Sequence, residues 1–441
     1  MTLSAWIATV VGFLRRRRVA AAGGALLVIL VAVWWSEWRQ GARTQPAIDW
    51  GPSPPSHEVA ALSSASQQPS SGLPTAKDDE LCGYGPVPVV DGIPQVPPEI
   101  ERAAQSALGS LAADLSARSA DRERAMGLYL QTIAAGAAWS RTHPNCATDD
   151  GACEFDANRA AWDATADSRR VLVRLATSTS DPDAYALAIY SCRPWPGVSS
   201  IGDCALLRNG QWARIEPDNA VPWLFVAGEA QQRGDRNAFE TALNRASKAR
   251  YSDPHLDQIS KLLASDALAA QSPPIQMQLA ISLLGIQAAL PLPDFHALAQ
   301  YCSGAAQTDP NGIQTCSDLA STLVEHGRTE VEVMVGGRIA EQIGSTNPRL
   351  STLRDEADAI RWQWGQWLKS MRETDHRSLT CNSLQALRRN AAVRAQLGES
   401  GRLYQQLAVS GLTASQAAER WRADMRQFQQ QSHGPQPKSS R

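Results

Sequence analysis

The feature that constrains this chain most is an uncharged, apolar run near its N-terminus. Residues 19–35 read VAAAGGALLVILVAVWW and contain no charged side chain. A helix of this length spans roughly 25 Å, slightly less than the hydrocarbon core of a bilayer at about 30 Å. Trp34, Trp35 and Trp38 lie where aromatic side chains gather at a membrane interface. The run therefore predicts a single transmembrane anchor at residues 19–35.

Four consecutive arginines indicate how this anchor is oriented. Arg15, Arg16, Arg17 and Arg18 directly precede the run, whereas two arginines and one glutamate follow it closely. The positive-inside rule then places residues 1–18 in the cytoplasm and the rest of the chain on the far side. A cleaved signal peptide is the alternative, but bulky tryptophans occupy the zone where small residues would mark cleavage. A buried core helix is disfavoured by the arginines at its edge.

Composition divides the rest of the chain into a tether, a body and a tail. Residues 44–80 are rich in Pro, Ser, Gln and Ala and show no apolar periodicity, so they predict a flexible linker. We expect residues 81–430 to form the folded domain and residues 431–441 a disordered tail. The stretch CGYGPVPVVDGIPQVPPE, which begins at Cys82, carries several valines. It predicts an extended arm that packs against the domain.

Apolar residues in the body recur at helical spacing, and no stretch shows sustained alternation of period two. The first helical face, after a Pro-Pro pair suited to a helix start, is formed by Ile100, Ala104, Leu108, Leu111 and Leu115. Proline-marked boundaries then recur at Pro182, Pro217 and Pro254, at a period typical of helical repeats. The predicted fold class is all-α, an irregular stack of antiparallel helical hairpins.

One unit of this series, residues 217–250, resembles a tetratricopeptide (TPR) repeat. The matching positions are Trp223, Val226 and Ala227 in the first helix, Gly234-Asp235 at the turn, and Leu243 with Ala246 in the second helix. The unit departs from the family pattern at Ala230, where a tyrosine is usual, and at Phe239, where a small residue is usual. The resemblance implies a TPR-like solenoid whose concave surface binds protein or peptide partners. Trp223 either fills the hairpin interface of its unit or is an exposed binding residue, and the effect of Trp223→Ala on stability separates the two.

An even number of cysteines predicts a disulfide framework on the non-cytoplasmic side. The eight are Cys82, Cys146, Cys153, Cys192, Cys204, Cys302, Cys316 and Cys381. Local spacing pairs Cys146 with Cys153, Cys192 with Cys204, and Cys302 with Cys316. Cys82 and Cys381 then pair by elimination, although the sequence leaves open that both are free or pair between molecules. Zinc is the alternative at His143, Cys146 and Cys153, but no CxxC pair accompanies them.

Two other groups of residues invite a functional interpretation. Asp253 and His255 could form an acid–base pair, but beside Pro254 we expect them to cap a helix at a repeat boundary. The run WQWGQW at residues 362–367 could be a carbohydrate or ligand platform. Because Ile360, Trp364, Trp367 and Met371 fall at helical spacing, we expect a core stripe instead, with Trp362 pointing elsewhere.

The sequence carries no HExxH, Gly-x-Ser-x-Gly, GxGxxG or P-loop motif. Residues 1–43 hold six arginines and one glutamate, so the remainder of a chain with a net charge of −2 carries −7. An acidic body disfavours nucleic-acid binding. We therefore expect a non-enzymatic scaffold for protein or peptide partners, without cofactor, metal or nucleic acid. We place it in a bacterial inner membrane, where its anchor contacts lipid and its domain is periplasmic. The alternative is an envelope-polymer hydrolase with a dispersed active site.

Overall fold

The computed structural model describes residues 78–90, 93–142, 159–160, 162–193, 202–304, 308–344, 348–373 and 379–432. The expected anchor at residues 19–35, its flank Arg15 to Arg18, nearly all of the linker, and Cys146 with Cys153 lie outside these ranges. Within them, no helix combines the length and hydropathy needed to cross a bilayer.

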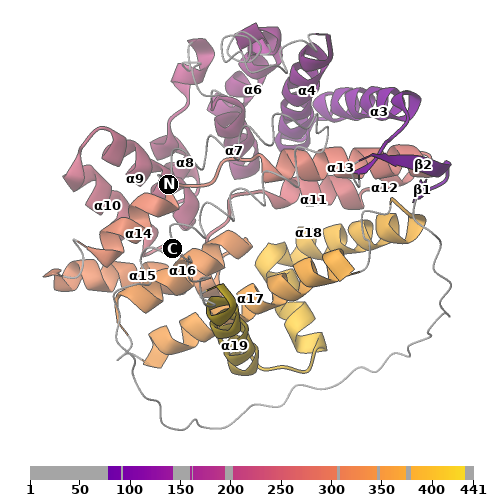
Figure 1. The fold of residues 1–441 in the computed structure, drawn as a ribbon. Helices are drawn as coiled ribbons and strands as arrows, with labels where there is room; N and C mark the ends of the chain where they lie inside the picture. The colour runs from indigo at the N-terminus through magenta and orange to yellow at the C-terminus, as the bar shows by residue number, and fades with distance from the viewer. Residues whose placement is uncertain are drawn as a thin grey trace, which may run out of the picture.

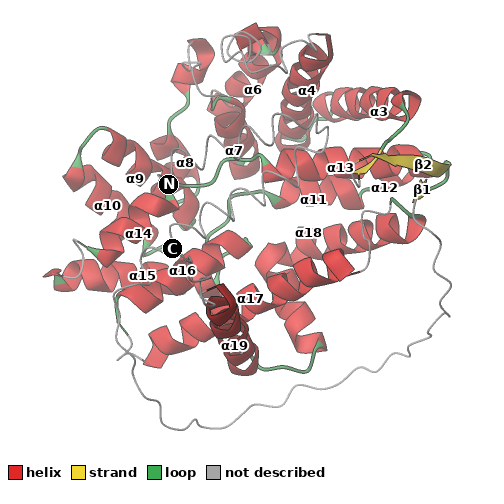
Figure 2. Cartoon of the chain, viewed as in Figure 1, coloured by secondary structure: helices red, strands yellow, loops and turns green. Residues whose placement is uncertain are grey.

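Helices make up most of the described chain, as the all-α prediction requires (Figure 2). Those of the N-terminal half are α3 (Pro98–Ser116), α4 (Asp121–Thr142), α6 (Ala166–Ser178), α7 (Pro182–Ser191), the short 3₁₀ helix η3 (Gly202–Leu206), α8 (Asn209–Ile215), α9 (Ala220–Gln232) and α10 (Arg236–Ala246). Those of the C-terminal half are α11 (Asp257–Ala264), α12 (Asp266–Ala269), α13 (Pro273–Ala288), α14 (Phe295–Ser303), α15 (Pro310–Glu325), α16 (Glu330–Gln342), α17 (Pro348–Glu373), α18 (Cys381–Val409) and α19 (Ala414–Ser432).

Many of these helices begin where the sequence supplies a cap. Asp181, Asp235 and Asp294 each precede a helix and accept a hydrogen bond from a backbone N–H in its first turn. Thr329 and Glu332 form a reciprocal capping box at the start of α16. These side chains satisfy N–H groups that have no partner inside the helix, which fixes where each helix starts.

The Val-rich arm is extended and packed against the domain, as expected. It forms the strands β1 (Asp78–Leu81), β2 (Gly85–Val90) and β3 (Ile93–Pro94), paired antiparallel in sequence order. Leu81 and Val87 are buried in the core. The predicted boundary at residue 81 is slightly too late, because residues 78–80 pair with β2 instead of belonging to the linker.

Two large hydrophobic cores and a smaller one, formed by Ala359, Leu407 and Ala417 of α17, α18 and α19, organise the helices. Figure 1 shows how these helices are arranged. The first core is formed by β1, β2, α3, α4, α6–α8, α11–α13 and the start of α18. The second core is formed by α10, α14–α17 and the later part of α18. Helix α9 faces both, since Phe225 lies in the first core and Leu224 in the second. Helix α18 also reaches both, and it is broken at Gly398 (φ 74°, ψ 179°).

The TPR-like unit folds as a hairpin of α9 and α10, with Gly234 (φ 70°) at the turn. Trp223 packs against the second core. Its side chain is only partly buried, and its Nε1 donates to the carbonyl oxygen of Pro217 at 3.1 Å. The tryptophan that is fully enclosed is Trp212 on α8, which stacks on Phe225 with ring centroids 5.7 Å apart.

Three of the predicted disulfides lie in the described chain and are confirmed. Cys192–Cys204 joins the end of α7 to η3, and Cys302–Cys316 joins α14 to α15. Cys82–Cys381 joins the arm to the start of α18, with a Cα–Cα distance of 4.6 Å. Beside it, the backbone N–H of Cys82 donates to the carbonyl oxygen of Leu379 at 2.8 Å.

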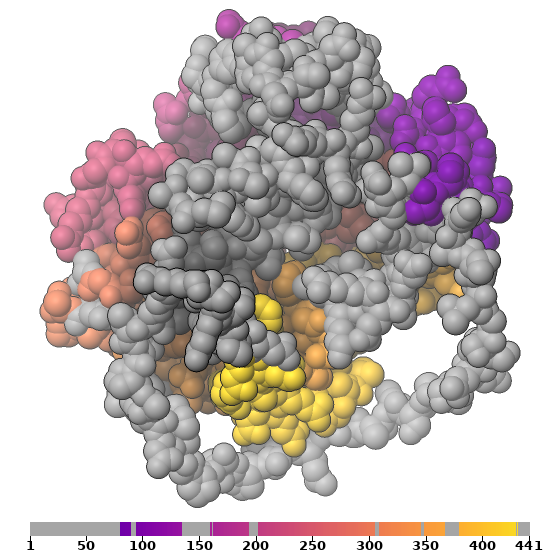
Figure 3. All heavy atoms as spheres, viewed as in Figure 1, coloured from indigo at the N-terminus to yellow at the C-terminus, as the bar shows by residue number. Residues whose placement is uncertain are grey.

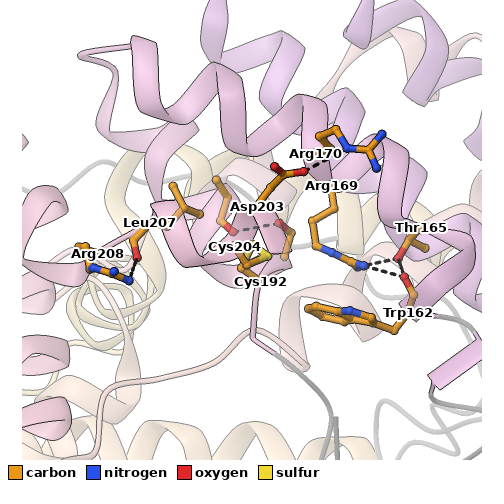
Figure 4. Close-up of a disulfide and its surroundings, with 11 residues drawn as sticks. Trp162, Thr165, Arg169, Arg170, Cys192, Asp203, Cys204, Leu207 and Arg208 are labelled. Carbon is orange, nitrogen blue, oxygen red and sulfur yellow. Dashed lines mark hydrogen bonds and ion pairs between the residues drawn. A yellow bond between two sulfur atoms is a disulfide. The ribbon is translucent and has the colours of Figure 1, made fainter. Parts of the chain in front are cut away.

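Figure 4 shows the Cys192–Cys204 bridge, which ties η3 to the end of α7, together with a second contact that η3 makes with α6. Arg170 on α6 forms an ion pair with Asp203 on η3 at 3.1 Å. The neighbouring Arg169 stacks its guanidinium 3.5 Å from the ring centroid of Trp162. Charge, stacking and a covalent bond thus fix this edge of the first core.

Candidate functional site: a buried polar junction

Segments from four distant parts of the chain meet where the two cores adjoin. We call residues 216–219, 250–257, 326–332 and 398–400 the polar junction. The N–H of Ala220 donates to the carbonyl of Tyr251 at 2.8 Å, and the N–H of Ser252 donates to the carbonyl of His326 at 3.1 Å. The N–H of Glu399 in turn donates to the carbonyl of Arg328 at 2.7 Å. The junction is therefore a continuous series of backbone contacts.

The sequence places helix ends at this point, which is why polar groups collect there. Pro217 and Pro254 keep the first two segments non-helical, since proline cannot donate to a helical ladder. Glycine is required at the other two. A Cβ at Gly327 would meet the carbonyl oxygen of Leu323 at 2.2 Å, and a Cβ at Gly398 would meet that of Arg328 at 2.9 Å. The proline spacing noted in the sequence therefore marks this junction.

His255 lies at the centre of a buried ion cluster. Its Nδ1 is 2.6 Å from Oδ1 of Asp183 on α7, and its Nε2 is 2.9 Å from Oε2 of Glu216. The three side chains are 7, 6 and 7% exposed, so solvent screens these pairs little. His255 has a backbone φ of 57°, which is unusual for a residue other than glycine and is held by this surrounding structure.

The expectation that Asp253 and His255 cap a helix is wrong. Helix α11 begins at Asp257, and the residue before it, Leu256, makes no side-chain cap. Asp253 Oδ1 instead accepts the backbone N–H of His255 at 2.7 Å, which stabilises the turn. No local pattern marks Asp183 and Glu216 as partners of His255, because they lie 72 and 39 residues away from it in the sequence.

The cluster is charged at neutral pH. Burial by itself lowers the pKa of His255, but hydrogen bonds to Asp183 and Glu216 and the surrounding negative charge raise it well above 6.5. Burial raises the pKa of Asp183 and of Glu216, but the hydrogen bond and charge of His255 outweigh it and lower both. An imidazolium thus lies between two carboxylates.

Neutral donors complete the cluster and fix its geometry. Glu216 accepts from Nε1 of Trp212 at 3.2 Å, from Nδ2 of Asn219 at 2.9 Å and from the hydroxyl of Tyr251 at 3.0 Å. Arg122 forms an ion pair with Asp183 from the outside. A buried ion pair resists disruption when its remaining lone pairs are satisfied in this way.

A convergence of carboxylates and histidine suits acid–base chemistry only where a substrate can reach it. The cavity beside the cluster, lined by residues that include Asp253, Asp257, Arg328 and Glu399, has a volume of about 20 Å³. This is room for one water molecule. Among the described residues, no group of three or more His, Cys, Asp or Glu is arranged to hold a metal ion. The geometry of the cluster therefore fits a structural role.

An accessible hollow of about 550 Å³ lies instead along α19. It is lined by Leu412, Gln416, Glu419, Arg420, Ala423 and Arg426. The C-terminal residues, yellow in Figure 3, are exposed on the face toward the viewer. We call this surface the α19 groove. It is open, and its charged side chains point to solvent.

The tryptophan run at residues 362–367 lies on α17, next to α19. Ile360 is fully buried, as a core stripe requires, and Trp364 is partly buried. Trp367 and Met371 fall outside the residues whose side chains are described. Trp362 points to α19, where the guanidinium of Arg420 lies 5.5 Å from its ring centroid. Among the side chains that the structure describes, Trp362 connects the run to the α19 groove through Arg420.

Searches against protein-family models, curated proteins and solved structures find no match to this chain.

Proposed function

We propose that this chain is a membrane-anchored periplasmic scaffold that binds a protein or peptide segment in the α19 groove and performs no catalysis. The anchor at residues 19–35 with its arginine flank supports the membrane attachment. The helix pairs α9–α10 and α15–α16, each joined by a short connection, support an irregular TPR-like stack. Such stacks present extended surfaces suited to binding partners.

The observation that carries the proposal is the character of the α19 groove. Its lining residues recur every three or four positions, so they form one continuous face of α19 and the turn before it. A helix or extended peptide recognises such a face through side chains at matching spacing. With two arginines against one glutamate, the groove favours a partner segment that carries acidic side chains beside small apolar ones.

A binding surface works best on a rigid support, and α19 is well fixed. Arg422 reaches across to α17, where its Nε is 2.9 Å from Oδ2 of Asp358 and its Nη2 pairs with Asp355. On the same side, Ala417 is fully buried between the helices. Among the described residues, the charged side chains of the groove face remain exposed and available to a partner.

The alternative, an envelope-polymer hydrolase, needs an accessible acid and base. In the described chain, the best candidates for these groups are in the His255 cluster, where the adjacent cavity admits one water molecule. The α19 groove has the room but carries a single carboxylate, Glu419. Polymer hydrolysis by paired carboxylates requires two. These observations favour the scaffold.

Site-specific photo-crosslinking in native membranes tests the proposal. A photoreactive amino acid at Ala423 should form a discrete adduct with a partner, whereas the same group at the exposed Asn244 on α10 should not. Reversing the charge with R420E and R426E should abolish the Ala423 adduct, and E419Q should leave it intact or strengthen it. An adduct that survives charge reversal, or equal labelling at both positions, would rule the α19 groove out as the binding site.

A further inference from the structure

In the described chain, no disulfide joins the two cores, and the polar junction is one of the contacts between them, beside α9 and α18, which belong to both. In the described chain, Cys82–Cys381 and Cys192–Cys204 lie in the first core and Cys302–Cys316 in the second. At the junction, the N–H of Arg328 donates to the carbonyl of Ser252 at 3.0 Å. Helix α18 contributes residues to the first core before Gly398 and to the second core after it, and it is broken at Gly398. If the two cores moved relative to each other, the backbone contacts of the junction and the break in α18 would change most.

Glu332 occupies the centre of this contact. Its side chain is fully buried on α16, and it accepts from the N–H and hydroxyl of Thr329 at 2.9 and 2.8 Å. It also makes a close hydrogen bond with the hydroxyl of Ser252, which comes from the segment before α11. Among described side chains, no cation lies within ion-pair distance of Glu332.

The charged groups that face Glu332 are already committed to other partners. Arg328 is held by Asp253 at 3.2 Å and by Asp257 at 2.7 Å. On α18, Arg394 pairs with Glu399, and Arg402 lies 3.6 Å from Glu330. In the segment before α11, the charge of His255 is neutralised by Asp183 and Glu216. From α7, Tyr190 donates to the carbonyl of Pro254 at 2.7 Å. A negative charge on Glu332 would therefore be buried without a counter-ion.

We propose that the polar junction is a proton-controlled latch between the two cores, closed when Glu332 is protonated and loosened when it is ionised. In the neutral form, the carboxyl group satisfies Ser252 and Thr329 without a buried charge. Ionisation adds a charge close to Asp253, which is itself negative. Contact with water stabilises the carboxylate. Water reaches it when the segments at residues 250–257 and 326–332 separate.

Two observations support this assignment. Burial raises the pKa of Glu332 to about 7, against the opposing effect of its hydrogen bonds from Ser252 and Thr329. The group therefore titrates near neutral pH. In addition, the cavity of about 20 Å³ at the junction is lined by Thr329 and Gly398, so it adjoins both the Glu332 cap and the break in α18. A first water molecule has a place to enter there.

Hydrogen exchange tests the latch in the full-length protein. After correction for intrinsic exchange rates, backbone amides in residues 250–257, 326–332 and 396–402 should exchange about tenfold faster at pH 8 than at pH 6. This ratio follows from a Glu332 pKa of 4.5 in the open state and about 7 in the closed state. Amides in the first turn of α3, at the far side of the first core, exchange by local fraying and should not change. Equal protection of the junction at both pH values in the unmodified protein would overturn the proposal.

A matched pair of variants assigns the effect to this carboxyl group. E332Q keeps a neutral side chain of the same size and should remove the pH dependence of exchange at the junction. E341Q, on the same helix but partly exposed and paired with Arg338, should retain it. If E332Q folds and keeps the full pH dependence, Glu332 is not the latch. If E332Q does not fold, E330Q decides: junction exchange that keeps its pH dependence in E330Q supports Glu332, and exchange that loses it assigns the effect to Glu330, whose pKa is also raised by burial.

Discussion

Nδ1 of His255 lies 2.6 Å from Oδ1 of Asp183, although the two residues belong to the segment before α11 and to α7. Through Nε2, the same imidazole reaches Glu216, just before α9. One side chain therefore connects three places at which the chain leaves or enters a helix. The neighbouring Tyr190, also on α7, donates to the carbonyl of Pro254. The helices of the first core are positioned by these polar contacts as well as by apolar packing.

Removing the imidazole should strongly destabilise the protein. His255→Ala leaves Asp183 and Glu216 buried without their shared cation, which should lower the free energy of unfolding by roughly 3–5 kcal/mol. His296→Ala, at an exposed position on α14, is the control and should have little effect. Thermal unfolding followed by tryptophan fluorescence measures both. Similar melting temperatures for the two variants would contradict a structural role of the cluster.

The stability of the protein should peak in mildly acidic solution. The pKa values of Asp183 and Glu216 are lowered on folding. Their contribution to the free energy of unfolding is therefore present when the pH is above the pKa of the unfolded carboxyl group. It is lost as the pH falls through the pKa of the folded one. The pKa of Glu332 is raised from 4.5 to about 7, so its contribution is present below 4.5 and lost as the pH rises toward 7. That loss amounts to about 3 kcal/mol. His255, whose pKa is raised well above 6.5, keeps its full contribution below 6.5 and loses part of it between pH 6.5 and pH 8, in the same direction as Glu332.

Denaturant titrations from pH 3 to pH 8 measure this profile. Unfolding free energy should rise from pH 3 to about pH 5 and fall again by pH 8. The D183N variant should flatten the acid side of the profile and leave the neutral side unchanged. A free energy that rises steadily up to pH 8 would contradict the assignment for Glu332.

The two tryptophans near the TPR-like unit should differ in their contribution to stability. Trp212 is fully buried and donates to Glu216, so Trp212→Ala should cost roughly 3–5 kcal/mol. Trp223 is partly exposed, so Trp223→Ala should cost roughly 1–2 kcal/mol, within the range of ordinary substitutions. Denaturant unfolding of the two variants under one condition gives the comparison. An equal loss would mean that Trp223 is packed more tightly than its exposure indicates.

Local patterns in the sequence were sufficient for the helical class and for the two short disulfides of the described chain, whereas Cys82–Cys381 was paired by elimination. The apolar spacing from Ile100 onward corresponds to α3, and the Cys192–Cys204 spacing corresponds to a bridge across one turn. The same local patterns left the burial of Trp223 open, because the family pattern specifies a hairpin but not what packs beside it. His255 was misassigned for a related reason. Its partners are brought to it by the tertiary fold, and neither Asp183 nor Glu216 stands at a spacing that any motif records.

The break in α18 should require glycine. Gly398 has φ 74°, and a Cβ would lie 2.9 Å from the carbonyl oxygen of Arg328. Gly398→Ala should therefore cost roughly 1–3 kcal/mol. Gly109→Ala in α3 is the matched control, since open space surrounds that position in a regular helix. It should stabilise the protein by roughly 0.5–1 kcal/mol. Melting temperatures should thus shift in opposite directions, and a neutral result at Gly398 would show that the break is not strained by a side chain.

The longest disulfide should contribute most to stability. Cys82–Cys381 closes a loop with a sequence separation of 299, which the chain-entropy treatment values at about 5–6 kcal/mol. Cys302–Cys316, with a separation of 14, is worth about 3 kcal/mol in the same treatment. Replacing each pair by alanine and comparing unfolding free energies under non-reducing conditions tests the difference.

Loss of Cys82–Cys381 should also have a local effect that the shorter bridge lacks. Without it, the arm is attached by its packed valines and by contacts such as the one between Cys82 and Leu379, so hydrogen exchange should increase in both β1 and the first turn of α18. The Cys302–Cys316 variant should leave these two segments protected. The double alanine variant at residues 82 and 381 could lose stability without faster exchange in either segment. The bridge would then stabilise the protein only by restricting the unfolded chain, and it would not hold the arm in place.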